Sequence, residues 1–359
     1  MRLTKWIAFF SLAACGAATG RTQESDPMKP RYSKSLYDLT PLPRDTVEKL
    51  ASKLSPEAYK ITQRAGTERA FCGAFFDNHK DGLYVCVVCG LPLFQSSAKF
   101  DSGTGWPSFF QPFDPDHVTI GRDDSLGMTR DEIRCARCNS HLGHVFDDGP
   151  PPTGQRHCLN SASLRFFETG PKGEMKDPLP PESLPVQTET AYFAGGCFWG
   201  IEHWLELGPG VIDAESGYMQ GKTDNPTYRD VCNHDTRHAE TVKVVFDPAR
   251  LSFERLLQAF FDIHDPTELD RQGPDEGDQY RSGVWFTSDA QKTTTEKYIA
   301  QLTAEKRYAS RPIVTKVEKA MKFWSAEEYH QDYVEKTGRA CHGSNPWTER
   351  ASKASGAKH

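Results

Sequence analysis

The first half of the chain has the hydrophobic pattern of a mostly β domain. The segment Asp45–Gln63 has a helical pattern, and it leads into short aromatic and β-branched runs that Gly and Pro residues separate. Runs of this kind, bounded by turn-forming residues, are typical of strands. The pattern therefore predicts a helix followed by a mostly β fold.

The second half has a different pattern, in which strand-like and helix-like segments alternate. Five apolar residues recur at helical spacing and are predicted to face a core. They are Phe253, Leu256, Leu257, Phe260 and Phe261. Another helix is predicted over Asp289–Tyr308, and strands at Ala191–Ala194, Thr241–Phe246 and Gly283–Thr287. Together these segments predict an α+β domain.

The chain length agrees with a division into two domains. At about 100 to 200 residues per domain, 359 residues are expected to form two. Residues 168–188 contain five prolines among charged residues, which is typical of a linker. The predicted domains are therefore 34–167 and 189–348, followed by a polar tail over 349–359. No internal repeat relates the halves, so each is expected to have its own fold and active site.

The first twenty residues indicate export. Arg2 and Lys5 precede a short apolar run, Trp6–Ala14, which ends in small residues. This is the pattern of a secretory signal, predicted over residues 1–20. The run is shorter than the roughly 20 apolar residues of a membrane span.

Cys15 gives the signal a more specific interpretation. Leu12–Cys15 resembles the lipobox of bacterial lipoproteins, in which the cysteine becomes the lipidated N-terminus. The alternative is ordinary cleavage near Ala18 or Gly20. We expect an exported protein of the cell envelope or periplasm, attached to the membrane through lipidated Cys15.

The overall charge gives no indication of nucleic-acid binding. The formal net charge is -6, from 43 Lys plus Arg and 49 Asp plus Glu. A nucleic-acid partner normally requires a basic surface. A small molecule or another protein is therefore the expected partner.

Four of the ten cysteines have the spacing of a metal site. They form two Cys-x-x-Cys pairs, namely Cys86 with Cys89 and Cys135 with Cys138. Two such pairs offer four thiolates to one tetrahedral zinc ion, and the residues that follow them, Gly90 and Asn139, permit the required tight turn. Four thiolates leave no open position for catalysis, so the zinc would be structural. Redox-active or structural disulfides are the alternative.

Cys158 is a candidate nucleophile in the first domain. It lies in Arg156-His157-Cys158-Leu159-Asn160, where basic neighbours could stabilise a thiolate and the amide could hydrogen-bond a substrate oxygen. The alternative for this segment alone is a buried, inert thiol.

Several strings around Cys158 resemble one known family. They are Gly105-Trp106-Pro107-Ser108-Phe109, the run from Cys138 to Gly149, and the Arg-His-Cys-Leu-Asn-Ser run that begins at Arg156. With the two cysteine pairs, they resemble methionine sulfoxide reductase B over 34–167. The resemblance implies a zinc-containing fold of two antiparallel sheets. It also implies that Cys158 is the nucleophile and that Trp106 holds the substrate methyl group. The residues expected to shape the sulfoxide site are His141, His144, Arg156 and Asn160, with Asp147 orienting a histidine.

The sequence departs from this family where the resolving cysteine is usually found. Thr104 occupies that position, just before Gly105. Cys72 lies in a region where some members carry an alternative resolving cysteine, so we assign this role to Cys72. If Cys72 is inert, an external thiol must reduce the Cys158 sulfenic acid directly.

Cys197 is the candidate nucleophile of the second domain. In Gly195-Gly196-Cys197-Phe198-Trp199-Gly200, a predicted strand ends in two glycines and a helix is expected to begin at the cysteine. Free N–H groups and the positive end of the dipole at a helix N-terminus lower the pKa of a thiol. Phe198 and Trp199 could form core packing or enclose an apolar methyl group.

The strings around Cys197 resemble methionine sulfoxide reductase A. They are Gly-Cys-Phe-Trp-Gly, Asn225 to Cys232, His238-Ala239-Glu240, Gln272 to Ser282, and Glu328-Tyr329-His330-Gln331. The resemblance covers about Thr190–Cys341 and implies an α+β sandwich. It implies that Cys197 attacks the sulfoxide sulfur and Glu240 supplies a proton to the oxygen. The residues expected around that oxygen are Tyr228, Tyr280 and Asp275.

The remaining cysteines receive different roles. Cys341 is expected to be the resolving cysteine for Cys197, although Arg339-Ala340 replaces the Gly-Tyr common in the family. Arg237 likewise precedes His238 where glycine is commoner. Cys232 is expected to be a structural thiol.

The two resemblances together imply reduction of free or protein-bound methionine sulfoxide, with the R epimer at Cys158 and the S epimer at Cys197. No flavin or nicotinamide is expected, and a thioredoxin-like protein would supply electrons. A non-catalytic, zinc-stapled binding module is the main alternative. A general disulfide oxidoreductase is a second, but Cys197 has no cysteine partner three residues on.

Overall fold

The computed structural model describes residues 29–124, 129–233, 235–339 and 343–348. The predicted signal peptide with Cys15, the polar tail and the predicted resolving residue Cys341 lie outside these ranges. Within the described ranges, no helix combines the length and the apolar character that a bilayer span requires.

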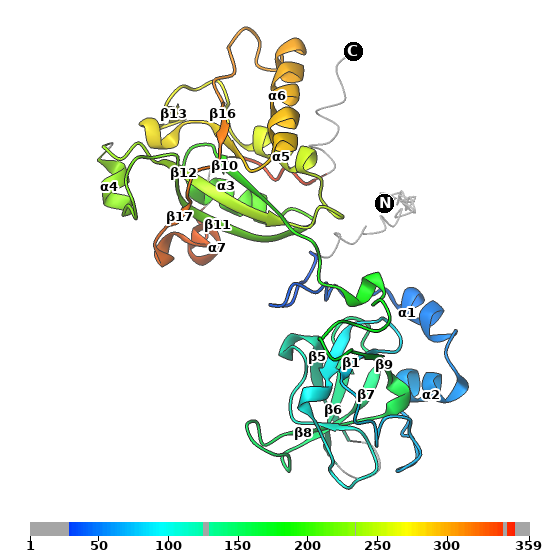
Figure 1. The fold of residues 1–359 in the computed structure, drawn as a ribbon. Coiled ribbons are helices and arrows are strands. Elements are labelled where there is room, and N and C mark those ends of the chain that lie inside the picture. The colour runs from blue at the N-terminus through cyan, green and yellow to red at the C-terminus, as the bar shows by residue number, and fades with distance from the viewer. Residues whose placement is uncertain (1–28, 125–128, 234, 340–342, 349–359) are drawn as a thin grey trace, which may run out of the picture.

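The chain forms two domains (Figure 1), and each has its own hydrophobic core. The first core contains Tyr84, Phe94 and Phe109, and the rings of Phe94 and Phe109 stack with centroids 4.6 Å apart. The second is built around Phe193 and Phe260, whose ring centroids are 4.9 Å apart. The predicted division into two different folds is confirmed.

The first domain is β-rich, as predicted, and contains two antiparallel sheets. The smaller sheet has the order β2-β1-β9, with β1 (Gly82–Cys86), β2 (Pro92–Gln95) and β9 (Leu164–Glu168). The larger has the order β3-β4-β8-β7-β6-β5. Its strands are β3 (Lys99–Phe100), β4 (Ser108–Phe109), β5 (Val118–Asp123), β6 (Arg130–Cys135), β7 (His141–Phe146) and β8 (Arg156–Leu159).

The single helix predicted over Asp45–Gln63 is wrong, because the segment forms two helices. They are α1 (Arg44–Ala51) and α2 (Pro56–Arg64). Pro56 has no backbone N–H to donate, which suits the first turn of a helix but not its interior. Ser55 caps α2 by accepting a hydrogen bond from the Ala58 nitrogen, so the chain restarts at this point.

The second domain is the predicted α+β fold, with helices packed on a six-stranded sheet of order β16-β15-β10-β12-β11-β17. Its strands are β10 (Glu189–Ala194), β11 (Val211–Met219), β12 (Ala239–Phe246), β15 (Gly283–Phe286), β16 (Lys316–Lys319) and β17 (Trp324–Ser325), and β13 (Arg271–Gln272) pairs with β14 (Asp275–Glu276). All neighbouring strands are antiparallel except β15 and β16. The helices are α3 (Phe198–Glu206), α4 (Tyr228–Cys232), α5 (Phe253–Ile263), α6 (Asp289–Ala304) and α7 (Tyr333–Thr337).

Most segments predicted in this domain are confirmed as β10, β12, β15 and α5. The helix predicted to reach Tyr308 ends at Ala304 as α6. Lys306, which follows the C-cap residue Glu305, has φ of +54° and adopts the left-handed conformation that ends a helix.

The segments outside the two cores connect the domains. In the predicted linker, Ser183 is fully buried and its hydroxyl donates to the Gly90 carbonyl. Near the N-terminus, the Tyr32 hydroxyl donates to Asp247 of the second domain, and Arg250 forms an ion pair with Asp38. The first contact attaches the linker to the first domain, and the other two attach the N-terminal segment to the second domain.

Candidate active sites and metal centre

Two tight turns bring the four paired cysteines together in the first domain. Cys86 ends β1 and Cys135 ends β6. In each turn the residue after the second cysteine has positive φ, +74° at Gly90 and +57° at Asn139. Their backbone nitrogens donate to the Cys86 and Cys135 carbonyls at 2.9 and 2.8 Å. This geometry directs both sulfurs of each pair toward the other pair.

The sulfur positions fit a tetrahedral metal ion. All four cysteines are buried, and their sulfurs lie within 4.8 Å of one another. The Sγ atoms of Cys86 and Cys138 are 3.6 Å apart, and those of Cys89 and Cys135 are 3.5 Å apart. A disulfide requires about 2.05 Å, whereas zinc–sulfur bonds of about 2.3 Å give a tetrahedron with edges of about 3.8 Å. The thiols are unbridged, and the donor set is that of a structural zinc site.

Cys158 opens onto a cavity of about 170 Å³ in the larger sheet of the first domain. It lies on β8, directly opposite His144 on β7 and Ser108 on β4. The cavity is lined by Thr67, Trp106, Arg130, Gly143, His144, Phe146, Cys158, Leu159 and Asn160. An aromatic wall beside a half-buried thiol and an imidazole can hold an apolar methyl group next to a nucleophile.

The environment of Cys158 raises the pKa of its thiol. Burial is the largest cause, and it outweighs the guanidinium of Arg156 and a hydrogen bond from Thr104, which both favour the thiolate. Arg156 is engaged by Asp148, with Nε and Nη2 donating to its carboxylate at 2.8 and 2.9 Å. The basic neighbour expected from the sequence, Arg156, is thus present, but its effect on the thiol pKa is smaller than that of burial.

Two carboxylates that the sequence did not indicate hold the histidines. His144 Nε2 lies 2.8 Å from Asp123 Oδ2, and His141 Nδ1 lies 2.6 Å from Glu132 Oε1. Asp147 is exposed and forms no hydrogen bond or ion pair with any described residue. The orienting role predicted for Asp147 therefore belongs to Asp123 and Glu132. Neither has a recognisable sequence signal, since both lie among other charges on strands.

Glu68 anchors the segment that carries Thr67 and Cys72 beside the cavity. Its buried carboxylate accepts hydrogen bonds from the backbone nitrogens of Ser161 and Ala162 at 2.7 and 3.0 Å. Its own nitrogen donates to Asn160 Oδ1 at 3.0 Å, and its carbonyl accepts from Trp106 Nε1 at 3.2 Å. Asn160 and Trp106 are thus positioned by this segment, on which Cys72 is exposed.

In the second domain, Cys197 is the N-cap of α3, as predicted. It follows β10 through Gly196, whose φ of +96° is in a region that residues with a side chain rarely adopt. A Cβ on Gly196 would lie 2.6 Å from Gln272 Cβ. The glycine therefore allows the chain to turn sharply and present Cys197 at the start of the helix.

Glu240 lies next to Cys197 as a fully buried carboxyl. It comes from β12, and its Oε2 accepts a 3.0 Å hydrogen bond from the Phe198 nitrogen. Burial raises its pKa to about 8, and the charge of Asp275 contributes in the same direction. Glu240 is therefore protonated at neutral pH and can donate a proton.

Tyr228, Tyr280 and Asp275 lie near enough to Glu240 to interact with it electrostatically. Burial and the charge of Glu240 raise the pKa of both tyrosine hydroxyls, and Cys197 also raises that of Tyr280. Both hydroxyls remain protonated and can donate hydrogen bonds. Cys232, predicted to be structural, hydrogen-bonds to Tyr228, and burial raises its thiol pKa.

Phe198 and Trp199 have different surroundings. Phe198 is 1% exposed and belongs to the hydrophobic core, where its ring lies 5.9 Å from that of Tyr218. Trp199 is half-buried, stacks on Tyr333 with centroids 3.6 Å apart, and donates from Nε1 to His330 Nδ1 at 3.0 Å. Of the two, Trp199 has the accessible ring.

Two further carboxylates stabilise this site and were not singled out from the sequence. Glu327 accepts from the Tyr218 hydroxyl and from the Tyr228 nitrogen, both at 2.9 Å. Glu202 is buried on α3, and burial raises its pKa to about 7. Glu202 did leave a signal, because it lies on the same helical face as the apolar residues Phe198 and Leu205. Glu327 left none.

Comparisons with known proteins match each half separately. The SelR domain matches residues 54–168, and the family described as peptide methionine sulfoxide reductase matches residues 189–357. Peptide methionine sulfoxide reductase MsrB of Thioalkalivibrio sulfidiphilus is 59% identical over 121 residues, 34% of this chain and 88% of that protein. Peptide methionine sulfoxide reductase MsrA of Acidobacterium capsulatum is 56% identical over 153 residues, 42% of this chain and 97% of that protein.

Among solved structures, the reduced form of Mxr1 from Saccharomyces cerevisiae is 32% identical and matches with a TM-score of 0.41, covering 50% of this chain and 94% of that one. The curated relatives are matched along nearly their whole length, one kind by each domain. The chain belongs to the peptide methionine sulfoxide reductases, and it joins an N-terminal MsrB-type domain to a C-terminal MsrA-type domain in one oxidoreductase.

Proposed function

We propose that the chain reduces the R epimer of methionine sulfoxide at Cys158 and the S epimer at Cys197. The observation that carries the proposal is the buried, protonated carboxyl of Glu240 beside the helix N-terminus that holds Cys197. A thiol nucleophile paired with a proton donor is what the removal of a sulfoxide oxygen requires.

At the second site, the Cys197 sulfur attacks the sulfoxide sulfur while Glu240 gives its proton to the oxygen. The hydroxyl then passes from the substrate sulfur to the Cys197 sulfur while the substrate S–O bond and the transient S–S bond break. Cys197 is left as a sulfenic acid, and methionine is released. The hydroxyls of Tyr228 and Tyr280 hydrogen-bond the oxygen as charge develops on it. Cys341 then displaces water from the sulfenic acid, forming a disulfide with Cys197.

At the first site, Cys158 performs the same attack with the substrate methyl group against Trp106. We assign proton donation to His144, because it lines the same cavity as Cys158 and is held by Asp123. Cys72 resolves the sulfenic acid in this proposal. Its support is the anchored segment that carries both Cys72 and Thr67, a residue of the cavity wall.

Zinc is the metal proposed for the four-cysteine cluster. The donor set, the burial of the four sulfurs and their 3.5 and 3.6 Å separations support it. A bound zinc ion would cross-link β1 and β6 through their ends, because Cys86 and Cys135 are the last residues of these strands.

A dithiol protein of the thioredoxin type would regenerate both sites by reducing their disulfides. The proposed substrates are methionine sulfoxide and oxidised proteins in the cell envelope, consistent with the signal-like first twenty residues. Lipidation at Cys15 is tested by mass spectrometry of the mature N-terminus, and an unmodified or missing Cys15 would exclude it.

Turnover of the separate R and S epimers, with dithiothreitol as reductant, tests the assignment. Cys158→Ser is expected to abolish reduction of the R epimer only, and Cys197→Ser that of the S epimer only. If either substitution removes both activities, the two sites are not independent. If the wild-type chain reduces neither epimer, the non-catalytic, zinc-stapled module becomes the better account.

A further inference from the structure

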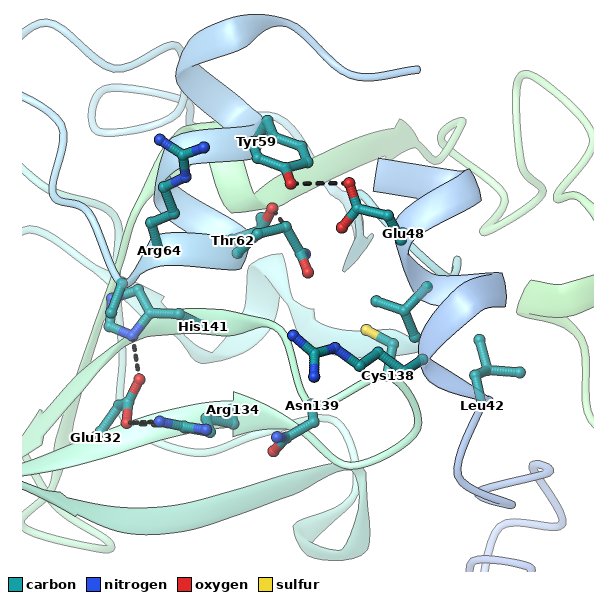
Figure 2. Close-up of a pocket in the computed structure, with 14 residues that line it drawn as sticks. Leu42, Glu48, Tyr59, Thr62, Arg64, Glu132, Arg134, Cys138, Asn139 and His141 are labelled. Atoms are coloured by element: carbon teal, nitrogen blue, oxygen red, sulfur yellow. Dashed lines mark hydrogen bonds and ion pairs between the residues drawn. The ribbon is translucent and has the colours of Figure 1, made fainter. Parts of the chain in front are cut away.

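A second cavity, of about 550 Å³, lies beside the proposed R-epimer site (Figure 2). Helices α1 and α2 form one side of it, where Figure 2 shows Glu48, Tyr59 and Arg64. Strands β6 and β7 form the other side, with Glu132, Arg134 and His141. None of these residues takes part in the proposed steps at Cys158, although the sequence assigned His141 to the sulfoxide site.

The two cavities lie on the same face of the sheet. Along β6, Arg130 lines the cavity of Cys158, whereas Glu132 and Arg134 line the second cavity. Alternate residues of a strand project to one face at intervals of about 6.8 Å. The side chains of Glu132 and Arg134 also form an ion pair at 2.7 Å, so they share a face despite the register shift between Ile133 and Arg134.

Residues of β7 also line both cavities. Gly143 and His144 line the first cavity and His141 lines the second, and the two imidazole rings are 5.4 Å apart between centroids. The cavities are therefore neighbours along the strands, separated by about the length of one or two residues of an extended peptide.

Arginine side chains outnumber glutamate side chains in the lining of the second cavity. Three arginines, Arg44, Arg64 and Arg134, stand against the two glutamates Glu48 and Glu132. Both glutamates are engaged: Glu48 accepts from the Tyr59 hydroxyl at 2.8 Å, and Glu132 binds Arg134 and His141. Arg44 and Arg64 are exposed and form no ion pair with any described residue. The Arg64 guanidinium lies over the Tyr59 ring, 5.7 Å from its centroid. An anion entering this cavity would therefore meet two guanidinium groups that have no carboxylate partner among the described residues.

His141 adds an unused hydrogen-bond acceptor. It is 4% exposed, and its Nε2 has no partner among the described residues. Glu132, ionised beside Arg134, can only accept a hydrogen bond, so Nδ1 of His141 carries the proton and Nε2 is left with a lone pair.

We propose that this cavity is a subsite for the polypeptide that flanks an R-epimer methionine sulfoxide, and that it favours acidic side chains. The sulfoxide would occupy the cavity of Cys158, the neighbouring backbone would pass His141, and an aspartate or glutamate would reach Arg44 and Arg64. The inference rests on the proposed function of Cys158, and it specifies oxidised polypeptides with acidic flanks as the preferred substrates of this domain.

The test compares acetylated five-residue peptides with a central R-methionine sulfoxide, flanked on both sides by two glutamates or by two lysines. The full chain is expected to reduce the glutamate peptide with a kcat/KM about tenfold higher. Arg64→Glu and, separately, Arg44→Glu should each reduce this ratio by about fivefold, the size of an effective exposed charge pair. Lys60→Glu is the matched control, because Lys60 is an exposed residue of the same helix as Arg64 and does not line the cavity. It should leave the ratio unchanged.

The outcomes separate this inference from the function on which it rests. If R-epimer peptides are reduced without preference, or if Lys60→Glu changes the ratio as much as Arg64→Glu, the subsite is excluded while the role of Cys158 stands. The same preference with S-epimer peptides would assign the effect to general electrostatic attraction. If Cys158→Ser still reduces the R-epimer peptides, the proposed function itself fails.

Discussion

The Glu240 carboxylate and the Phe198 backbone nitrogen are joined by a 3.0 Å hydrogen bond at the first turn of α3. Because Phe198 directly follows Cys197, this bond fixes the carboxyl beside the nucleophile. The same burial that removes Glu240 from water raises its pKa to about 8. One contact therefore connects the position of the proton donor with its protonation state.

This relationship predicts an alkaline limit for reduction of the S epimer. The protonated carboxyl is the active form, and it is lost as the pH rises through about 8. The kcat/KM for the S epimer is therefore expected to fall about tenfold per pH unit above that value. Glu240→Gln should lower kcat/KM by about 10²- to 10⁴-fold and abolish this limb of the pH profile. An unchanged alkaline limb in Glu240→Gln would assign the titration to another group.

Arg156 and Cys158 give a prediction for the other domain. Burial raises the thiol pKa of Cys158 and Arg156 opposes this, so Arg156→Ala should raise it further. We expect the pH dependence of Cys158 alkylation to move to higher pH. The measurement is the iodoacetamide alkylation rate at Cys158, followed by mass spectrometry. Arg122→Ala is the control, since Arg122 is exposed and paired with Asp124. A shift of equal size in the control would contradict a local effect.

The sequence was most informative where local chain geometry determines the chemistry. The Cys-x-x-Cys turns and the Gly-Gly-Cys strand-to-helix junction depend on residues adjacent in sequence, and the structure forms all three as predicted. Two-domain organisation followed from length and the change of pattern. The sequence pattern predicts one helix over Asp45–Gln63, whereas the structure has two, because Ser55 caps a second helix that begins at Pro56.

The carboxylates that hydrogen-bond the site residues could not be predicted from the sequence, because these groups meet only in the folded sheet. Asp123 and Glu132 are as far as 21 residues from the histidines that they hold, and Glu68 is 93 residues from Ser161. Asp147, which was expected from the resemblance to orient a histidine, is exposed. Strand pairing, rather than chain proximity, determines which carboxylate reaches an imidazole.

The positive φ of Gly196 leads to the prediction that the second site requires glycine at this position. Gly196→Ala combines φ of +96° with a Cβ placed 2.6 Å from Gln272, so the chain must shift at Cys197. We expect a loss of about 1–3 kcal/mol of stability and a fall in S-epimer turnover. Gly173→Ala is the control, because Gly173 has φ of +83° but no atom within 4 Å of the added Cβ. Stability is measured by thermal unfolding and turnover by S-epimer kinetics for both variants. Equal losses in the two variants would show that the contact with Gln272 is not the cause.

Removal of the proposed zinc should affect only one activity. The four cysteines join the turns after β1 and β6 in the first domain, and the second domain has a separate core. Exhaustive chelation, or Cys86→Ser, is expected to abolish R-epimer reduction while S-epimer reduction persists. Metal analysis should find one zinc per chain before treatment. Full R-epimer activity in metal-free protein would rule out a structural metal.

The hydrogen bonds of Glu68 lead to the prediction that one substitution lowers both the stability and the activity of the first domain. Its carboxylate accepts the backbone nitrogens of Ser161 and Ala162, next to Asn160 in the cavity wall. Glu68→Gln keeps the shape but replaces one acceptor oxygen with an NH₂ group, so one of these buried donors loses its partner. The expected cost is about 1–3 kcal/mol, measured by denaturant unfolding.

The activities of this variant distinguish a local effect from general instability. Trp106 Nε1 donates to the Glu68 carbonyl, so movement of this segment displaces the wall that is proposed to hold the substrate methyl group. R-epimer KM should therefore rise in Glu68→Gln, while S-epimer kinetics in the same sample provide an internal reference. Glu57→Gln is the matched control, because Glu57 is exposed at the start of α2. If the R-epimer KM is unchanged although unfolding occurs at lower denaturant, Glu68 stabilises the fold without positioning the cavity.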